Sequence, residues 1–334
     1  MSATDFEAGI PGAAPDTPAR RGRLLSREAL ARFFPVLLLA VLCVVFSVLS
    51  PRFLTVGNAM IVAQQAVVLL VTALGMTFVI VAGSIDLSVG AVVALSALAA
   101  ASTSGTLGAA AIVPACLVGL ACGLVNGVVI AVGKVPSFIV TLGAMVIYRG
   151  IVLLFTRGSP VSIDDESFLD AFAGRTWGLP HSALIALLLV ALCAVILNLT
   201  VFGREVKAVG GGERVARLTG IRVDRVKIAM FALLGLLCGV AGLLQSSRAM
   251  AATAQLGESL ELDVIAAVVV GGTPLTGGIG SIQGTILGVL IITMLSNGMN
   301  MIGVDPYLQN IVKGLVMVGA VFITIDRRKI GIIK

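Results

Sequence analysis

Charged and aromatic residues are both scarce in this sequence. Only 12% of its 334 residues are charged and 5% are aromatic, whereas 58% are hydrophobic and the mean hydropathy is +1.10. A soluble domain of this length needs far more polar surface to cover its core, so the composition excludes an ordinary soluble protein. Repeated uncharged runs longer than about 18 residues predict a membrane protein with many spanning helices.

Residues that catalysis or metal binding requires are also few. The lone histidine, His181, lies in a Leu-Pro-His-Ser context where a helix begins, so we expect a structural role for it. The cysteines show no metal-ligand spacing and are expected to be small core residues; they are Cys43, Cys116, Cys122, Cys193 and Cys238. We therefore expect no enzymatic role, and no cofactor or metal bound by this chain.

Glycine-rich stretches imitate nucleotide-binding loops without meeting their requirements. The stretch 127–134 has five residues between its glycines where four are needed, and Val135 replaces the Ser or Thr that would hold magnesium. The stretch 272–278 lacks the lysine, and 278–284 is one residue too long for a dinucleotide loop. Helix breaks and close helix packing are the favoured interpretation. We expect ATP hydrolysis to take place elsewhere.

The apolar runs divide into ten expected spans, which predicts an all-α polytopic membrane protein with some broken helices. The expected ranges are 33–50, 59–82, 87–105, 109–132, 136–156, 181–201, 227–247, 262–271, 282–302 and 307–325. The eighth range is too short to cross alone as a regular helix of about 20 residues, so we expect it to continue into a glycine-rich break. Nine or eleven spans are also compatible with the pattern.

Basic residues predict the orientation of these spans. Sixteen of the 23 Lys and Arg residues lie in the N-terminal flank, in the loop 202–227 and in the tail 327–334. Ten spans place all three segments on one side, which the positive-inside bias makes the cytoplasm, so both termini are expected there. The acidic segment 157–180 then lies outside. This distribution explains the net charge of +6 without a nucleic-acid partner.

The expected organisation is a disordered basic head, 1–32, a transmembrane domain, 33–326, and a cytoplasmic tail, 327–334. Within the domain two halves echo each other. The first half contains Gly83-Ser84, Asn126-Gly127 and Pro136, and the second contains Gly272-Thr273, Asn297-Gly298 and Pro306. One additional span in the first half reverses the later matching elements, as in an inverted repeat. The pattern predicts two pseudo-symmetric halves with a transport pathway between them.

The cytoplasmic loop contains a short amphipathic pattern. Val215, Leu218 and Ile221 are spaced by three, which predicts one apolar face on a helix of one to two turns. Glu213 falls in its first turn, where a carboxylate suits the helix dipole, and Gly220 is expected to end it. Docking into a groove of another protein is favoured over anchoring at lipid headgroups.

Asp86 stands alone in a long uncharged region. A carboxylate within the membrane is a candidate functional residue, and it offers thin support for an ion-coupled transporter. Its place at the join between the second and third spans favours a different role, in which Asp86, or Ser84 as its rival, breaks the helix and caps the next one.

Polar residues within apolar spans are candidates for a translocation path, because a path needs groups that exchange for a substrate's water. The alternative is that they join helices through hydrogen bonds of about 0.6–2 kcal/mol each. The candidates are Asn58, Gln64, Gln65, Asn126, Ser137, Thr141, Asn297, Asn300 and Asn310. Charged Arg149, Arg248 and Lys313 are expected to pair or to extend toward the headgroups.

Three segments carry a resemblance to a known family: GSIDLSVG at 83–90, AVGGGERVARLTGI at 208–221 and ELDVIAAVVVGGTPLTGGIGSIQGTILGVLI at 261–291. They resemble the permease subunits of ribose-type sugar ABC importers, from about residue 35 to 326. The resemblance implies a bacterial inner-membrane protein that pairs with a second permease copy, binds a cytoplasmic ATPase carrying ATP and Mg²⁺, and receives a monosaccharide from an extracytoplasmic binding protein. It also implies that the matching segment contacts the ATPase through Gly211, Glu213, Ala216, Thr219 and Gly220. A nucleoside, a branched-chain amino acid and a signalling sugar remain alternative substrates.

Overall fold

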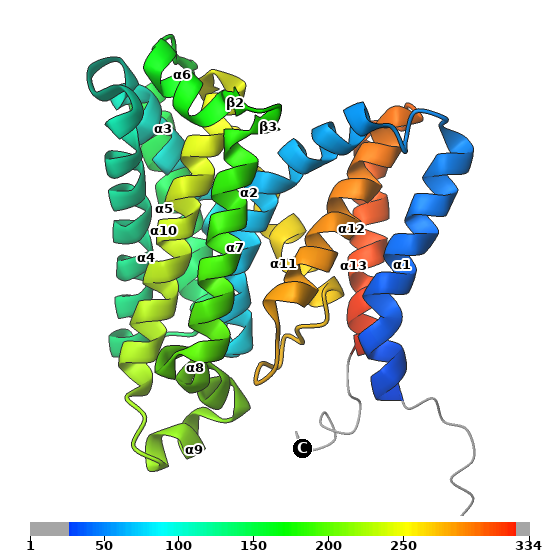
Figure 1. Cartoon of the computed structure of the whole chain (residues 1–334). Helices are drawn as coiled ribbons and strands as arrows, with labels where there is room; N and C mark the ends of the chain where they lie inside the picture. The colour runs from blue at the N-terminus through cyan, green and yellow to red at the C-terminus, as the bar shows by residue number, and fades with distance from the viewer. Residues whose placement is uncertain (1–26, 325–334) are drawn as a thin grey trace, which may run out of the picture.

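The computed structural model describes residues 27–324, and helices make up most of this part of the chain (Figure 1). In chain order the elements are α1 (Arg27–Leu49), α2 (Val56–Val81), α3 (Val89–Leu107), the 3-10 turn η1 (Gly108–Ala111), α4 (Ile112–Gly133), α5 (Ser137–Thr156), β1 (Val161–Ser162), α6 (Glu166–Ala173), β2 (Arg175–Thr176), β3 (Leu179–Pro180), α7 (His181–Leu199), α8 (Val201–Gly211), α9 (Glu213–Leu218), α10 (Val223–Ala249), β4 (Ala251–Ala252), α11 (Leu260–Val270), α12 (Ile282–Met301) and α13 (Pro306–Thr324). The predicted all-α polytopic class is confirmed.

Each of the ten expected ranges contains a helix, but fewer than ten stretches of residues 27–324 qualify as membrane spans. Six stretches of the described chain are long and apolar enough to cross a membrane. One of these, Val89–Gly133, contains both α3 and α4, which η1 divides where the chain reverses (Figure 1). As expected, α11 is too short to cross alone, because its 11 residues rise only about 16 Å, half of a hydrocarbon core.

The predicted boundary of the disordered head is wrong. The first helix, α1, begins at Arg27 and so includes residues that we expected to be disordered. Residues 27–31 read Arg-Glu-Ala-Leu-Ala, all strong helix formers that extend the apolar helix toward its N-terminus. The rest of the predicted head and the predicted tail, 327–334, lie outside the described residues.

Helices α4 and α10 form the closest packed pair, through glycines spaced by four. A Cβ on Gly123 would overlap the carbonyl oxygen of Phe231, and one on Gly119 would overlap that of Gly235. A Cβ on Gly127 would lie 2.9 Å from the Cα of Ile228. Glycine is therefore required for the backbones to approach this closely, as in small-residue interfaces of membrane helices. The prediction that Gly127 serves packing is confirmed.

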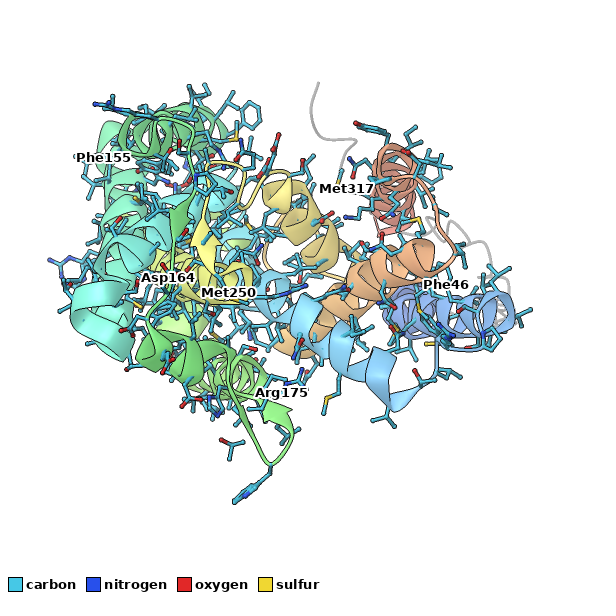
Figure 2. All side chains as sticks on the ribbon, turned by 90° about the horizontal axis from the view of Figure 1, so that it is seen from above. Phe46, Phe155, Asp164, Arg175, Met250 and Met317 are labelled. Carbon is cyan, nitrogen blue, oxygen red and sulfur yellow. The ribbon has the colours of Figure 1, made fainter. Side chains whose placement is uncertain are left out.

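Seen from above, the helices form two groups (Figure 2). One contains α3–α7 and α10, and the other contains α1, α12 and α13. Helices α2 and α11 lie between the groups and contact both of them. Most of α2 is buried, and the Phe46 ring of α1 packs directly on Gly298 of α12. The predicted inverted-repeat relation between the sequence halves stays a prediction.

The two ends of the bundle differ. One end carries α6 and the β2–β3 hairpin, and the other carries α8 and α9 (Figure 1). His181 joins the hairpin to α6, because its Nε2 lies 2.7 Å from the Thr176 hydroxyl and its Nδ1 2.9 Å from the Asp170 carbonyl oxygen. The structural role predicted for His181 is confirmed. Helix α1 begins, and α13 ends, at the end that carries α9 (Figure 1).

Candidate functional site

Helix α9 is a short helix that presents apolar side chains to its surroundings. Val215 and Leu218 are 65% and 81% exposed, while Ala216 faces inward and is buried. The predicted positions of Glu213 in the first turn and Gly220 after the helix are confirmed. Gly220 has φ of +89°, which lets the Ile221 N–H donate to the Ala216 carbonyl at 3.1 Å.

The expected three-residue apolar face is wrong in one position. Ile221 packs against the main core and does not continue the exposed surface of Val215 and Leu218. The cause is the turn at Gly220, because spacing by three keeps residues on one face only while the helix continues. The exposed apolar surface of α9 therefore consists of two side chains.

Ion pairs tie α9 to the start of α10. The Lys227 ammonium lies 2.7 Å from Glu213, and the Arg217 guanidinium lies 2.5 Å from Asp224 and 3.2 Å from Glu213. The hydrogen bond from Lys227 holds the pKa of the Glu213 carboxyl below its usual range, so this carboxylate loses its charge only in acid. Each exposed pair stabilises little, but the network fixes the orientation of α9.

The C-terminal end of α8 contacts the membrane core through backbone atoms. A Cβ on Gly210 would overlap the Val81 carbonyl oxygen and lie 2.6 Å from the Gly278 nitrogen, while nothing lies within 4 Å of one on Gly211. The Gly278 N–H donates to the same Val81 carbonyl at 2.8 Å. Three segments, namely α8, the loop 271–281 and the end of α2, therefore meet at one point, which we call the glycine junction.

The ends of α2 and α11 have the same geometry at the two echoing motifs. Gly83 has φ of +77° and Gly272 has φ of +94°. In each case the next residue donates its N–H to the carbonyl five positions back, Ser84 to Val79 and Thr273 to Val268. Both glycines thus close a Schellman motif. The predicted helix break at Ser84 is observed as the end of α2, and Ser84 does not cap α3.

Asp86 is buried in the break that follows. The N-cap residue of α3 is Ser88, so the prediction that Asp86 caps this helix is wrong by two positions. Asp86 Oδ1 instead accepts from the Ser88 backbone N–H at 2.7 Å and from its hydroxyl at 2.6 Å. Asn126 donates to the Ser88 hydroxyl and accepts from the Tyr148 hydroxyl at 3.0 Å. Asp86 thus closes the turn and starts a polar chain into α4 and α5.

Side chains of α5 satisfy the remaining backbone of this break. The Ile85 N–H donates to the Ser137 hydroxyl at 3.3 Å, and the Leu87 N–H donates to the Thr141 hydroxyl at 3.1 Å. These two hydroxyls lie one turn apart on α5. This spacing matches the distance between Ile85 and Leu87, two alternate residues of the non-helical stretch. A non-helical stretch in an apolar setting needs such partners, because each bare donor costs several kcal/mol.

Six of the nine path candidates hydrogen-bond other groups of the protein and so join helices. Besides the contacts of Asn126, Ser137 and Thr141, the Asn58 amide donates to Asn297 at 3.0 Å, and Gln309 donates to Asn300 at 2.7 Å. For Gln64, Gln65 and Asn310 the described residues provide no side-chain hydrogen bond. Gln64 lines a cavity, Gln65 is half-buried and Asn310 is exposed.

Two of the three charged residues that we expected to pair or to extend toward the headgroups, Lys313 and Arg149, have partners, whereas Arg248 is exposed in the last turn of α10 with no ion pair among the described residues. The Lys313 ammonium of α13 lies 2.9 Å from the Asp263 carboxylate of α11, and Arg149 donates to the carbonyls of Ala254 and Leu256. We did not predict the partners Asp263 and Asp224. Asp263 could have been predicted as a partner of Lys313, because opposite charges within membrane spans pair with one another.

We expect Asp86→Asn to keep the melting temperature of the purified protein close to the native value. An amide oxygen still accepts from the Ser88 N–H and hydroxyl, and no cation contacts the carboxylate in the described residues. Asp86→Leu removes the acceptor and is expected to cost about 1–3 kcal/mol of the free energy of unfolding. Thermal unfolding of both variants measures this, and an Asn variant as unstable as the Leu variant would contradict the assignment.

The helical bundle, with six stretches long and apolar enough to cross a membrane, defines a multi-pass membrane protein. Residues 58–321 match the family model for the branched-chain amino acid transport system / permease component, and the chain belongs to this family. Together with the relatives described next, this match confirms the expected resemblance to ribose-type sugar ABC permeases.

Several curated relatives are similar over most of their length. The ribose import permease protein RbsC of Bacillus subtilis is 42% identical over 299 residues, which cover 88% of this chain and 92% of RbsC. RbsC of Escherichia coli K12 is 41% identical over 297 residues, covering 87% and 92%. The L-arabinose transport system permease protein AraH of E. coli K12 is 36% identical over 324 residues, covering 95% of each chain. No solved structure matches the chain.

Proposed function

We propose that this chain is the membrane-spanning permease subunit of an ATP-driven ABC importer that moves a monosaccharide of the pentose or hexose class. The observation that carries the proposal is the near-full-length similarity to permeases named for ribose and L-arabinose. In this proposal an extracytoplasmic binding protein delivers the sugar, and a separate cytoplasmic ATPase binds and hydrolyses MgATP.

The ATPase docks on α9. Val215 and Leu218 are exposed in a helix otherwise rich in charge, which suits insertion into a groove of another protein. The residues proposed for coupling are Glu213, Ala216, Thr219 and Gly220, which form the start, the inward face and the end of α9. Gly211 is the last residue of α8 and has open space at its Cβ position, so we leave it out of the coupling set. The cytoplasmic side is then the end of the bundle that carries α9, where α1 begins and α13 ends (Figure 1).

Motion of α9 reaches the membrane by two routes. A cleft of about 680 Å³ lined by Glu213, Arg217 and Ser137 separates α9 from the start of α5, so force does not pass directly to α5. One route is the ion-pair network into α10, and the other is α8 with its glycine junction against α2. Rigid-body rocking of the packed helices follows from pushing two stiff elements.

The path lies along the face formed by α5, α11 and α13, where a second copy of the chain pairs with the first. Asn310 is exposed on α13, and the neighbouring Lys313–Asp263 pair is only part-buried. Polar and charged residues in spans normally face a bundle interior or water, so this face is poorly suited to lipid. We keep Asn310 as the path residue on this face and assign the six bonded candidates to helix contacts. Gln64 and Gln65 belong to α2, outside this face.

A selectivity measurement tests the substrate class. In proteoliposomes that contain the permease, its ATPase and its binding protein, we expect uptake of labelled D-ribose or L-arabinose to be competed by unlabelled pentoses and hexoses. Unlabelled leucine or a nucleoside should leave uptake unchanged. Uptake of labelled leucine or nucleoside in preference to sugar would replace the proposed substrate while retaining the permease function.

A further inference from the structure

A second cavity, of about 250 Å³, lies at the end of the bundle opposite α9. Its walls come from the N-terminal half of α2, the start of α7 and the end of α10, and from α6 and the β2–β3 hairpin. Val67, Val68, Leu169, Phe172 and Leu244 make its floor apolar, while Gln64, Ser182, Ser247, Arg175 and Arg248 bring polar groups. The cavity thus combines an apolar surface with two arginines, one at the end of α10 and the other in the β2–β3 hairpin.

Neither guanidinium has a carboxylate partner among residues 27–324. Arg175 of β2 and Arg248 in the last turn of α10 are exposed residues, and neither belongs to an ion pair within the described chain. Two unpaired guanidiniums at one cavity favour an anion, and their planar donor geometry matches phosphate or carboxylate oxygens.

The hairpin that carries Arg175 is held in place. His181 hydrogen-bonds Thr176 in the same hairpin and the Asp170 carbonyl of α6, and these bonds fix Arg175 beside the cavity. Figure 2 labels Arg175 and Met250, two residues that line the cavity. At the hairpin tip Trp177, the one tryptophan of the chain, is 98% exposed. Tryptophan at this position is typical of the headgroup layer at a membrane interface.

We propose that this cavity binds the phosphate group of an anionic lipid of the extracytoplasmic leaflet, with Arg175 and Arg248 on the phosphate and the apolar floor against the start of the acyl chain. A lipid accounts for the apolar floor, the interfacial tryptophan and the location at span ends together. Helix α6 contributes Leu169 and Phe172 to the apolar surface and lies at the end of the bundle opposite α9 (Figure 1). This site is independent of the transported substrate.

Delipidated native protein is compared with the double variant Arg175→Gln/Arg248→Gln. The control is Arg157→Gln, because Arg157 is exposed at the same end of the bundle but does not line the cavity. Native mass spectrometry measures retained phosphatidylglycerol, and thermal unfolding measures its stabilising effect. We expect the native protein and the control to bind phosphatidylglycerol alike, and the double variant to bind about tenfold more weakly, since bonds to charged groups are lost.

Four outcomes would overturn the lipid assignment. Equal retention by the double variant and the control would show that the arginines do not bind lipid. Equal stabilisation by phosphatidylcholine would show that negative charge is not recognised, and equal stabilisation of lipid-free protein by sodium phosphate would assign the cavity to a soluble anion. If the double variant weakens binding of the extracytoplasmic binding protein but retains phosphatidylglycerol, the arginines serve protein docking and the lipid assignment fails.

Discussion

Gly210→Ala is expected to abolish ATP-driven uptake, whereas Gly211→Ala is expected to transport like the native protein. The two glycines are neighbours at the end of α8, so the change in helix propensity is similar. A Cβ at 210 overlaps the Val81 carbonyl oxygen, but a Cβ at 211 has nothing within 4 Å. Because the obstructing atoms are backbone, Gly210→Ala must separate α8 from α2 and the loop 271–281, which breaks one of the two routes from α9.

Uptake and ATP hydrolysis are measured on the same proteoliposomes, and the melting temperature of each variant shows whether the fold survives. Overpacking costs about 1–3 kcal/mol, which a folded bundle of this size tolerates. We expect hydrolysis to continue in Gly210→Ala while uptake is lost. Native uptake by a folded Gly210→Ala protein would show that the glycine junction does not transmit motion.

Gly123→Leu is expected to prevent the bundle from assembling, while Gly105→Leu is expected to be tolerated. On α4, Gly123 faces the Phe231 carbonyl oxygen of α10, and a leucine there pushes the two backbones apart. The α4–α10 contact is the most extensive in the molecule, so we expect a loss of at least about 3 kcal/mol in the free energy of unfolding. On α3, Gly105 has nothing within 4 Å of its Cβ position.

The amount of folded protein in the membrane and the melting temperature in detergent measure both variants. Leucine is a better helix former than glycine by close to 1 kcal/mol, so Gly105→Leu is expected to be neutral or slightly stabilising. A Gly123→Leu protein that is as abundant and as stable as the Gly105→Leu protein would contradict the proposed close packing of α4 and α10.

Local patterns predicted the helices but not their partners. Apolar runs found a helix in all ten ranges, because a helix in lipid satisfies its own backbone whatever surrounds it. The same reasoning recognised that α11 is too short to span. It did not show that Asn58 and Asn297, 239 positions apart, bond each other, since sequence spacing carries no information on such contacts.

The candidate site was predicted where it depends on helix ends. Glu213 and Gly220 were placed correctly on α9, because first-turn carboxylates and C-terminal glycines have local physical causes. Asp86 was misplaced by two positions, since Asp, Ser and Ser within five residues offer several equivalent caps and tertiary contacts with α4 and α5 decide between them. The glycine junction was missed because it joins α2, α8 and the loop 271–281 in space.

The energy source of uptake tests the account most directly. Proteoliposomes are prepared with the chain and its ATPase, and the binding protein and labelled sugar are added on the side opposite the ATPase. ATP is supplied on the ATPase side. Uptake is measured with and without ionophores that collapse the proton and sodium gradients. The account predicts uptake that requires ATP and persists when the ion gradients are collapsed. Uptake that proceeds without ATP and stops when the gradients collapse would contradict it and assign the chain to ion-coupled transport.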